Sequence, residues 1–359
     1  MKVLQNISLK QYNTFGIDVK AAQFVVFKTT DEAAEIIEFN KPQTSNLKPQ
    51  TSSRLRRDKP QTFILGGGSN ILFTQNFNGL ILKNEIGGIE KIKEDDKHVY
   101  VKAGAGINWH QLVLHSIENN WAGLENLSLI PGNAGASPMQ NIGAYGVEIK
   151  DVFLELEALY IDENKLVSFN ANDCEFGYRE SVFKRKYKNK FIITSVTYRL
   201  NKQPAFNTSY GAIEQELDKM GVKELSIKAI SQAVINIRSS KLPNPAEIGN
   251  AGSFFKNPEV HKDHYQKLKS GYPAIVGYDL PNGNVKLAAG WLIEQCGPQG
   301  SVSWKGYREG DAGCHSRQAL VLVNYGNATG EQIFTLSDKI IKSVKEKFQV
   351  VLEREVNIV

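Results

Sequence analysis

Alternating hydrophobic and polar positions predict a chain in which strands and helices follow one another. A first strand is expected at residues 22–27, and a helix with Asp31 ahead of its apolar positions at 30–39. Further strands are predicted at 62–65, 79–82, 98–103, 153–160, 165–169, 191–200, 319–323 and, with charges inside it, 350–359. Helices are predicted at 109–119, 226–238, 288–295 and 329–348. This interleaving indicates a mixed α and β protein.

The chain of 359 residues is too long for one ordinary core, and two to three domains are expected. We predict parts at 1–65, 66–240 and 241–359, the last border following from the breaker cluster that begins Lys241-Leu242-Pro243. The first part carries a low-complexity insertion at 41–61, in which Lys-Pro-Gln-Thr recurs. Its Pro, Ser, Gln and basic residues cannot build a core, so a solvated insertion is expected. A nucleic-acid or membrane tether is the less favoured alternative.

Composition narrows the class of protein. Hydrophobic residues make up 41% and charged residues 23%, which is ordinary for a soluble enzyme, and the net charge of +5 is small. It favours anionic substrates but gives no argument for nucleic acid. We expect no transmembrane helix, no export and a cytoplasmic monomer. Cys174, Cys296 and Cys314 are far apart, so partly buried thiols are expected and no metal site.

Two glycine-rich loops suggest a ligand. Gly66-Gly67-Gly68-Ser69-Asn70 follows a strand, and its glycines allow positive φ and a nest of N–H groups for a phosphate. The run 131–146 contains four glycines and three alanines, so it can lie flat against a planar ligand. The loop 104–109 resembles a dinucleotide fingerprint, but Trp109 replaces the third glycine, so a structural role is expected there.

The segment 250–258 places Ser253 in a turn of small residues, beside two aromatics, a cation and an amide. A serine held in this way can donate a proton in a closed, partly apolar site. Because no histidine lies within seven residues of Ser253, the segment offers no local base for a serine hydrolase.

Seven segments together resemble the family of UDP-N-acetylenolpyruvoylglucosamine reductases, in the expected order over nearly the whole chain: 13–16, 66–70, 123–125, 131–146, 176–181, 250–258 and 352–356. The resemblance implies an α+β fold with a two-part FAD-binding module of the vanillyl-alcohol-oxidase/PCMH type and a smaller substrate-binding domain. It implies non-covalent FAD and NADPH as hydride donor. It assigns cofactor contacts to Gly66, Gly67, Gly68, Ser69, Asn70, Pro131, Gly132, Gly135, Ala136, Ser137, Asn141, Ile142, Gly143, Ala144, Gly146 and, more weakly, Arg238.

The resemblance also assigns the chemistry. The substrate would be UDP-N-acetylglucosamine-enolpyruvate, reduced to UDP-N-acetylmuramate in peptidoglycan synthesis by a hydride from flavin N5 to the methylene carbon. Ser253 matches the proton donor. Arg179 and Glu355, the latter on the last predicted strand, match the pair that stabilises the substrate carboxylate. An arginine suits this task because it binds a carboxylate with two parallel hydrogen bonds.

The remaining matches concern the substrate diphosphate. Tyr210, in a loop near 202–212, is typical of the type I branch of the family, and Lys241, Asn257 and Gln318 match other contacts. The stretch 304–317 departs from the family pattern, which makes Gln318 less secure. Two rivals stay open: an FAD-dependent oxidase of small alcohols or sugars, and a catalytically dead nucleotide-sugar-binding protein.

Overall fold

A computed structural model describes residues 2–40, 61–209, 211–298 and 301–359. Contacts divide the chain into two compact units, each described below by itself. The first consists of Met1–Ile7, Ala21–Gly67 and Asn78–Ile237, and the second of Ser8–Lys20, Gly68–Phe77 and Arg238–Val359. The predicted division into three parts stays a prediction, and most of the low-complexity insertion lies outside the described residues.

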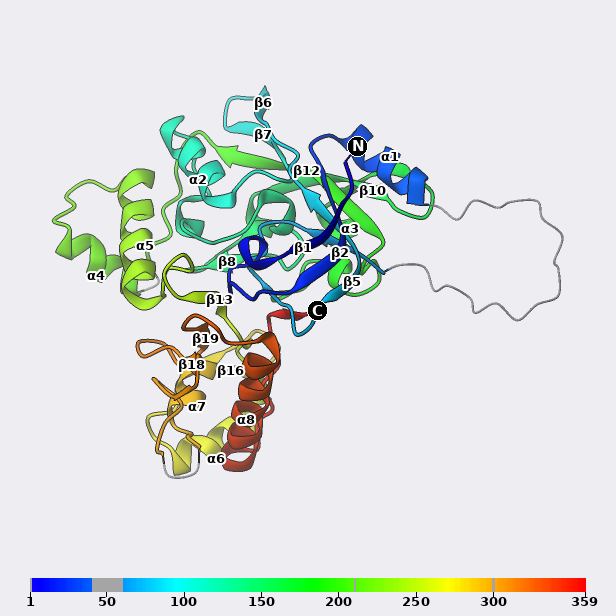
Figure 1. Ribbon diagram of the computed structural model, residues 1–359. Helices are drawn as coiled ribbons and strands as arrows, with labels where there is room; N and C mark the ends of the chain where they lie inside the picture. Colours follow the sequence, from blue (N-terminus) through cyan, green and yellow to red (C-terminus); the bar gives the residue numbers. More distant parts are fainter. Residues whose placement is uncertain (1, 41–60, 210, 299–300) are drawn as a thin grey trace, which may run out of the picture. The chain divides into compact units, whose positions relative to one another are not determined.

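The first unit begins with a four-stranded sheet (Figure 1). Its order is β1 (Leu4–Ser8), β2 (Lys20–Phe27), β5 (Phe77–Asn84), β3 (Gln61–Leu65). Helix α1 (Thr30–Asn40) packs its buried Ala33, Ile36 and Ile37 against apolar residues of this sheet. The helix is capped by Thr29, whose hydroxyl accepts from the Glu32 N–H, while the Glu32 carboxylate accepts from the Lys28 N–H. Asp31, which stands ahead of the apolar positions, lies inside the first turn and is not the capping residue.

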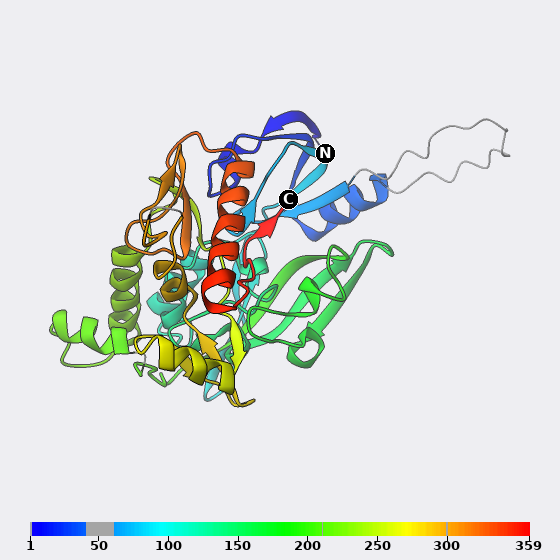
Figure 2. The same cartoon turned by 90° about the horizontal axis from the view of Figure 1, so that it is seen from below.

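The second sheet of this unit has five strands, and Figure 2 shows its long green strands side by side. Their order is β11 (Lys165–Asn170), β10 (Phe153–Tyr160), β12 (Phe191–Asn201), β7 (His98–Gly104), β6 (Ile89–Glu94). Helix α2 (Trp109–Glu118) packs on one face, where Leu112, Val113 and Leu156 are fully buried. The unit also contains the hairpin β8–β9 (Gly143–Ala144, Val147–Glu148), the short helix α3 (Ala171–Cys174) and 3-10 turns at Glu125–Leu127, Ala134–Ala136, Ile149–Asp151 and Val182–Lys184.

Helices α4 (Gly211–Lys219) and α5 (Ile227–Lys241) share a separate apolar cluster. Ile213 and Leu217 of α4 pack with Ile230 and Val234 of α5, which are spaced as expected for one helix face. Helix α5 ends three residues later than predicted, at Lys241.

Among its described residues, the second unit combines small sheets with three helices. One sheet has the order β13 (Gly249–Ser253), β19 (Val321–Asn324), β18 (Ala312–Cys314), β17 (Arg308–Glu309). A second sheet is formed by β14 (Glu259–His261), β16 (Asn284–Leu287) and β15 (Gly277–Asp279), and β20 (Asn357–Ile358) pairs with β4 (Ile71–Leu72). The helices are α6 (Lys262–Gly271), α7 (Ala289–Glu294) and α8 (Gly330–Phe348), and a 3-10 turn spans Lys10–Tyr12. Helix α8 buries Ile333, Leu336, Ile340 and Val344 along one face.

The predicted strand at 350–359 is wrong over most of its length. Only Asn357–Ile358 forms a strand, and Arg354 makes an isolated bridge to Phe255. The rest of the segment is held by single backbone contacts, not by the continuous hydrogen-bond ladder of a strand. No helix in the described part of the chain is long and apolar enough to cross a membrane.

Candidate functional site

The two glycine-rich loops of the predicted cofactor site meet in the first unit. A Cβ on Gly67 would lie 2.8 Å from Asn133 Oδ1 and 2.9 Å from Gly132 Cα, so only glycine allows this approach. Gly132 O accepts from the Trp109 N–H, and the Ala134 and Gly135 N–H groups donate to Ile107 and Ala105. The 104–109 loop therefore has the structural role that its sequence predicts: it holds the 131–136 segment in place.

Ser137 and Asn141 use their side chains inside the protein. The Ser137 hydroxyl is buried and lies 2.9 Å from the Tyr198 hydroxyl. The Asn141 amide donates to Glu148 Oε2 and Gly177 O, and its Oδ1 accepts from the Lys150 N–H. These two residues therefore fix the shape of the loop, and they can serve a cofactor through their backbone.

The strands β8 and β9 form a two-residue hairpin. Tyr145 and Gly146 at its tip have φ of 51° and 80°, which is typical of the turn that suits the twist of such hairpins. The Asn126 amide binds Tyr145 O and Asn207 O, and the Asn207 amide binds Gly146 O. The hairpin is thus tied to the loop that leads toward Tyr210, and Tyr210 itself lies outside the described residues.

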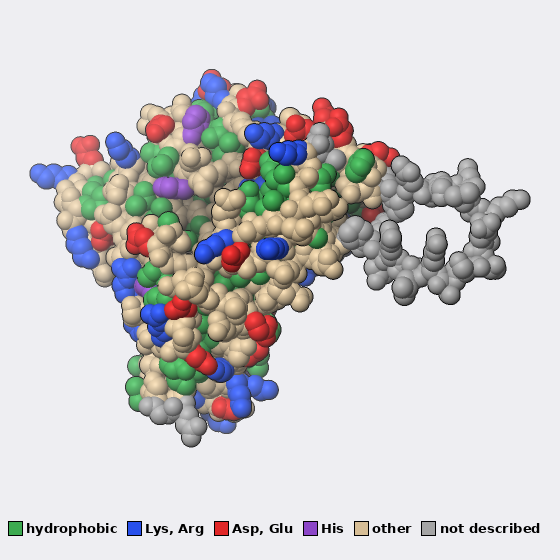
Figure 3. Space-filling model, viewed as in Figure 1, with side chains coloured by type: hydrophobic (Ala, Val, Ile, Leu, Met, Phe, Trp, Pro, Cys, Tyr) green, Lys and Arg blue, Asp and Glu red, His purple; other side chains and the backbone are tan. Residues whose placement is uncertain are grey.

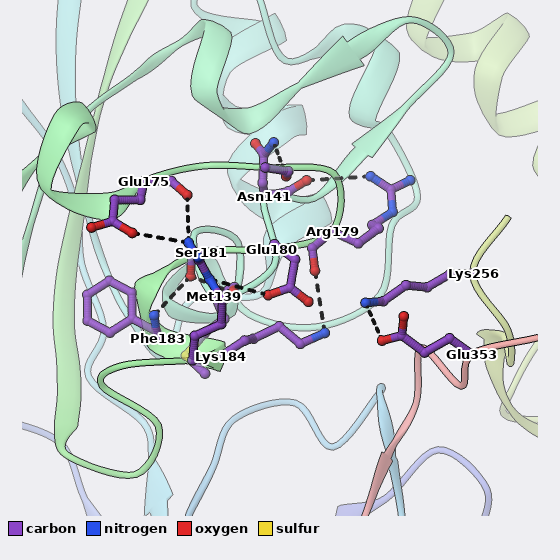
Figure 4. Close-up of polar contacts among 12 residues, drawn as sticks. Met139, Asn141, Glu175, Arg179, Glu180, Ser181, Phe183, Lys184, Lys256 and Glu353 are labelled. Atoms are coloured by element: carbon purple, nitrogen blue, oxygen red, sulfur yellow. Dashed lines mark hydrogen bonds and ion pairs between the residues drawn. The ribbon is translucent and has the colours of Figure 1, made fainter. Parts of the chain in front are cut away.

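The Arg179 side chain contacts Asn141, which lies just before this hairpin in the chain (Figure 4). Its Nη2 donates to Gly143 O at 2.5 Å and its Nη1 to Asn141 O at 3.4 Å, and its own backbone has a φ of 54°. A left-handed backbone is rare at residues other than glycine and is retained only where the surroundings impose it. The structure therefore brings Arg179 to the loop that is expected to hold the flavin.

Ser253 is half-buried at the end of β13, in the second unit. Asn250 shapes the turn before it: its amide donates to Pro243 O and Ile248 O, and its Oδ1 accepts from the Gly252 N–H. Gly252 has a φ of 71°, which the small-residue turn predicted here requires. Ser253 itself pairs with Val321 of β19.

Glu355 is also half-buried, and its backbone joins the serine segment. The Glu355 N–H donates to Phe254 O, and the Lys256 N–H donates to Glu353 O. Glu355 O accepts from the Asn70 amide at 3.3 Å, so the end of the first glycine loop is tied to the same segment. Lys256 is buried and forms a 2.6 Å ion pair with Glu353 (Figure 4). The structure thus places Ser253 and Glu355 on adjacent chain segments of one unit.

The other matched motif segments of this unit converge on the same place. Gly68 has a φ of 65°, and a Cβ there would overlap Tyr12 O, which explains the third glycine of the loop. The Thr14 N–H donates to Gly68 O, and Thr14 O accepts from the Asn250 N–H. Segment 13–16 therefore links the glycine loop to the serine turn.

Two predicted diphosphate contacts gather at the start of α7. Asn257 Oδ1 accepts from the Ala289 N–H, and a Cβ on Gly290 would lie 2.9 Å from Gln318 Oε1. Lys241 is exposed at the end of α5, where Arg317 Nη1 donates to the neighbouring Ser240 O. Arg238, the weaker match, lies one turn earlier in α5, and its carbonyl accepts from the Leu242 N–H.

The three cysteine side chains, all in the described part of the chain, are thiols near neutral pH, because burial raises their pKa. Cys174, Cys296 and Cys314 are buried and free, which confirms the expected thiols, and burial raises the pKa of Cys174 and Cys314 to about 12. On the face shown in Figure 3, basic and acidic side chains are interspersed. A buried carboxylate, Glu125, accepts from the Gly123 N–H, and burial raises its pKa.

The residues of the two loops fit FAD. Where the loops meet at Gly67 they leave no room for side chains, and a Cβ on Gly143 would meet Glu148 Cγ at 2.9 Å and Arg179 Nη1 at 3.0 Å. A flat chain of this kind offers its backbone amides to a planar ring and to phosphate oxygens. Backbone contacts of this type suit a non-covalent flavin.

Comparisons with known proteins agree with an FAD-binding site. Residues 51–169 match the family "FAD binding domain", and residues 244–359 match "UDP-N-acetylenolpyruvoylglucosamine reductase, C-terminal domain". The chain is 47% identical over 360 residues to the UDP-N-acetylenolpyruvoylglucosamine reductase of Flavobacterium johnsoniae and 49% identical over 359 residues to that of Amoebophilus asiaticus, with full coverage of both partners in each case. The solved structure of the reductase from Thermus caldophilus, 21% identical, has the same fold with a TM-score of 0.63 over 100% of this chain and 99% of the other.

Sequence identity of 47–49% to these two reductases over the full length shows that the chain shares their family. The α+β fold with an FAD-binding part and the cofactor FAD, both implied by the family resemblance, are confirmed. The chain belongs to the UDP-N-acetylenolpyruvoylglucosamine reductase family of oxidoreductases.

Proposed function

We propose that this protein reduces UDP-N-acetylglucosamine-enolpyruvate to UDP-N-acetylmuramate in the cytoplasm, with NADPH as the hydride donor, and so supplies a peptidoglycan precursor. The observation that carries the proposal is the full-length similarity to reductases of this name, joined to intact Ser253, Arg179 and Glu355 in matching motifs. When bound, FAD supplies the carrier that passes a hydride between NADPH and the enolpyruvyl methylene carbon.

Arg179 binds the substrate carboxylate in this proposal. The carbonyl oxygens of Gly143 and Asn141 hold its guanidinium, whose five N–H donors form a fork that fits a carboxylate. Addition of a hydride to the methylene carbon leaves a carbanion whose charge is delocalised into that carboxylate as an enolate, and the arginine stabilises the growing negative charge. Glu355 orients the same group by a hydrogen bond, for which it shares or carries a proton.

Ser253 completes the reaction by giving its hydroxyl proton to the carbon that bears the carboxylate. One hydride and one proton then account for the two hydrogens that the double bond gains. The enolate carbon is basic enough to take a proton from a serine, which is a poor acid elsewhere. The turn fixed by Asn250 and Gly252 supports this role because it holds the hydroxyl in one place.

The diphosphate is held by Lys241, Asn257, Gln318 and Tyr210. Asn257 contributes its amide N–H₂, since its Oδ1 accepts from the Ala289 N–H. Exchange of Tyr210 for Phe should weaken binding of the enolpyruvyl nucleotide about tenfold or more, because a hydrogen bond to a charged group is lost.

An anaerobic absorbance experiment tests the function. The yellow protein should be bleached by NADPH and should regain its colour when the enolpyruvyl nucleotide is added, and mass spectrometry should find UDP-N-acetylmuramate. UDP-N-acetylglucosamine, which lacks the double bond, is the matched control and should leave the protein bleached. Recolouring only by oxygen would identify an oxidase, and a protein that binds the nucleotides without bleaching would be a binding protein without activity.

A further inference from the structure

His315 has no role in the proposed reaction, yet it is only 4% exposed and directly follows β18. Its Nδ1 is buried and has no hydrogen-bond partner among the described residues. A buried polar atom without a partner is uncommon and calls for an explanation. His315 lies inside segment 304–317, the stretch that departs from the expected family pattern.

The register of the sheet relates His315 to Ser253. Ser253 of β13 pairs with Val321 of β19, and on the other side of β19 the His315 N–H donates to Val321 O. Cross-strand partners direct their side chains to the same face, so Ser253 and His315 flank Val321 on one face of the sheet. With two strand spacings between them, their backbones are about 10 Å apart, too far for a direct hydrogen bond.

The state of the imidazole follows from its surroundings. Burial, and secondly the charge of Arg317, lower the pKa of His315 below its ordinary value, so the ring is neutral near pH 7. A neutral ring carries its proton on one nitrogen only. We assign the proton to Nε2, because a buried N–H at Nδ1 would have no acceptor, and Nδ1 then keeps the lone pair. Nε2 is then a hydrogen-bond donor.

We propose that His315 is a substrate-binding residue whose Nε2–H donates to an oxygen of the sugar–diphosphate part of the nucleotide. This inference rests on the proposed function. The separation of about 10 Å between the backbones of Ser253 and His315 is too large for both residues to contact the enolpyruvyl group, so His315 would bind another part of the nucleotide. Gln318 and Lys241, two of the proposed diphosphate contacts, belong to the same region: Gln318 follows His315 by three residues, and Arg317 binds the carbonyl beside Lys241.

Paired substitutions test this role in the flavin-loaded protein. A glutamine amide can reproduce the Nε2–H donor, whereas an asparagine amide reaches only the position of Nδ1. We expect His315→Asn to raise the dissociation constant for UDP-N-acetylglucosamine about tenfold or more, measured by calorimetry, and His315→Gln to stay within about threefold of wild type. Loss of affinity for UDP as well assigns the contact to a phosphate oxygen, and loss for the sugar nucleotide alone assigns it to the sugar.

Controls separate binding from folding. His264→Asn alters a half-buried histidine of the same unit whose Nε2 contacts Phe348 O, and it should change stability without changing these dissociation constants. Equal dissociation constants for wild type and His315→Asn, or equal losses in the Asn and Gln variants, would overturn the proposal. In the wild-type protein, nitrogen NMR should find the Nε2–H form of His315 and a shift of that signal on saturation with UDP-N-acetylglucosamine, and an unchanged signal would also overturn it.

Failure of the proposed function and failure of the role of His315 give different results. A wild-type protein that is not recoloured by the enolpyruvyl nucleotide would contradict the reaction. A wild-type protein that turns over normally, beside a His315→Asn variant with unchanged KM, would contradict the role of His315 alone.

Discussion

Gly143 links the flavin loop to the arginine that we assign to the substrate. Its carbonyl accepts from Arg179 Nη2, and the space beside its Cα is taken by Glu148 Cγ, Val147 O and Arg179 Nη1, all between 2.9 and 3.0 Å from an added Cβ. A methyl group here must therefore displace either the hairpin or the guanidinium.

Gly143→Ala should weaken binding of the enolpyruvyl nucleotide by on the order of tenfold, because overpacking of this size costs about 1–3 kcal/mol. Calorimetry on the oxidised protein measures this. Gly87→Ala is the matched control: nothing lies within 4 Å of its added Cβ, so affinity should not change. Equal affinity in both variants would show that substrate binding by Arg179 does not depend on the conformation of the hairpin.

The thiols should be unreactive in the folded protein. Burial raises the pKa of Cys174 and Cys314 to about 12, so at pH 8 almost no thiolate is present at either residue, and reactivity should rise only as the pH approaches that value. Mass spectrometry after iodoacetamide treatment should find these residues unlabelled at pH 8 and labelled in urea. Rapid labelling of the folded protein at pH 8 would mean that the sites open readily.

The sequence motifs indicate which residues are candidates for the chemistry, but they do not show which contacts the neighbouring side chains make. Ser253 and Arg179 stand in motifs whose small residues have visible backbone reasons, such as the positive φ of Gly252. Asn141 and Asn257 looked like ligand contacts, but their side chains also hold loop and helix ends, which only the fold reveals. His315 could not be found from sequence, because its signal is a buried nitrogen without a partner.

At the scale of elements, the spacing of apolar residues in the sequence identified the helices and strands that bury one face. Helix α8 was predicted to within one residue at its start because its apolar positions recur every three to four residues behind the capping Thr329. Strand β6 was missed because most of its residues are exposed and charged, and α6 because it buries only Leu268. The strand predicted for 350–359 was wrong because its partners are single bridges from distant segments.

The cap of α8 offers a test at this scale. Thr329 Oγ1 accepts from the Gln332 N–H, and Gln332 Oε1 accepts from the Thr329 N–H. Thr329→Ala should destabilise the helix start by about 1 kcal/mol, which corresponds to roughly fivefold faster hydrogen exchange where α8 opens locally. Thr329→Ser keeps the hydroxyl and should exchange as wild type does. Identical exchange rates in both variants would show that the Thr329 side-chain hydrogen bond does not stabilise the start of α8.

At the scale of the whole molecule, the residues assigned to catalysis belong to both units. Arg179 and the flavin loop 131–146 belong to the first unit, while Ser253, Glu355 and the proposed diphosphate contacts Lys241, Asn257 and Gln318 belong to the second. The proposed reaction assigns carboxylate binding to Arg179 and proton donation to Ser253. A variant that lacks the proton donor should therefore keep the first half of the catalytic cycle and lose the second.

Anaerobic stopped-flow absorbance of Ser253→Ala measures the two halves separately. Bleaching by NADPH needs no proton from Ser253, so its rate should stay within several-fold of wild type. Recolouring by the enolpyruvyl nucleotide should slow by about 10²–10⁴, the usual contribution of a positioned general acid. Equal slowing of both halves, or normal recolouring, would contradict the assignment of Ser253 as the proton donor.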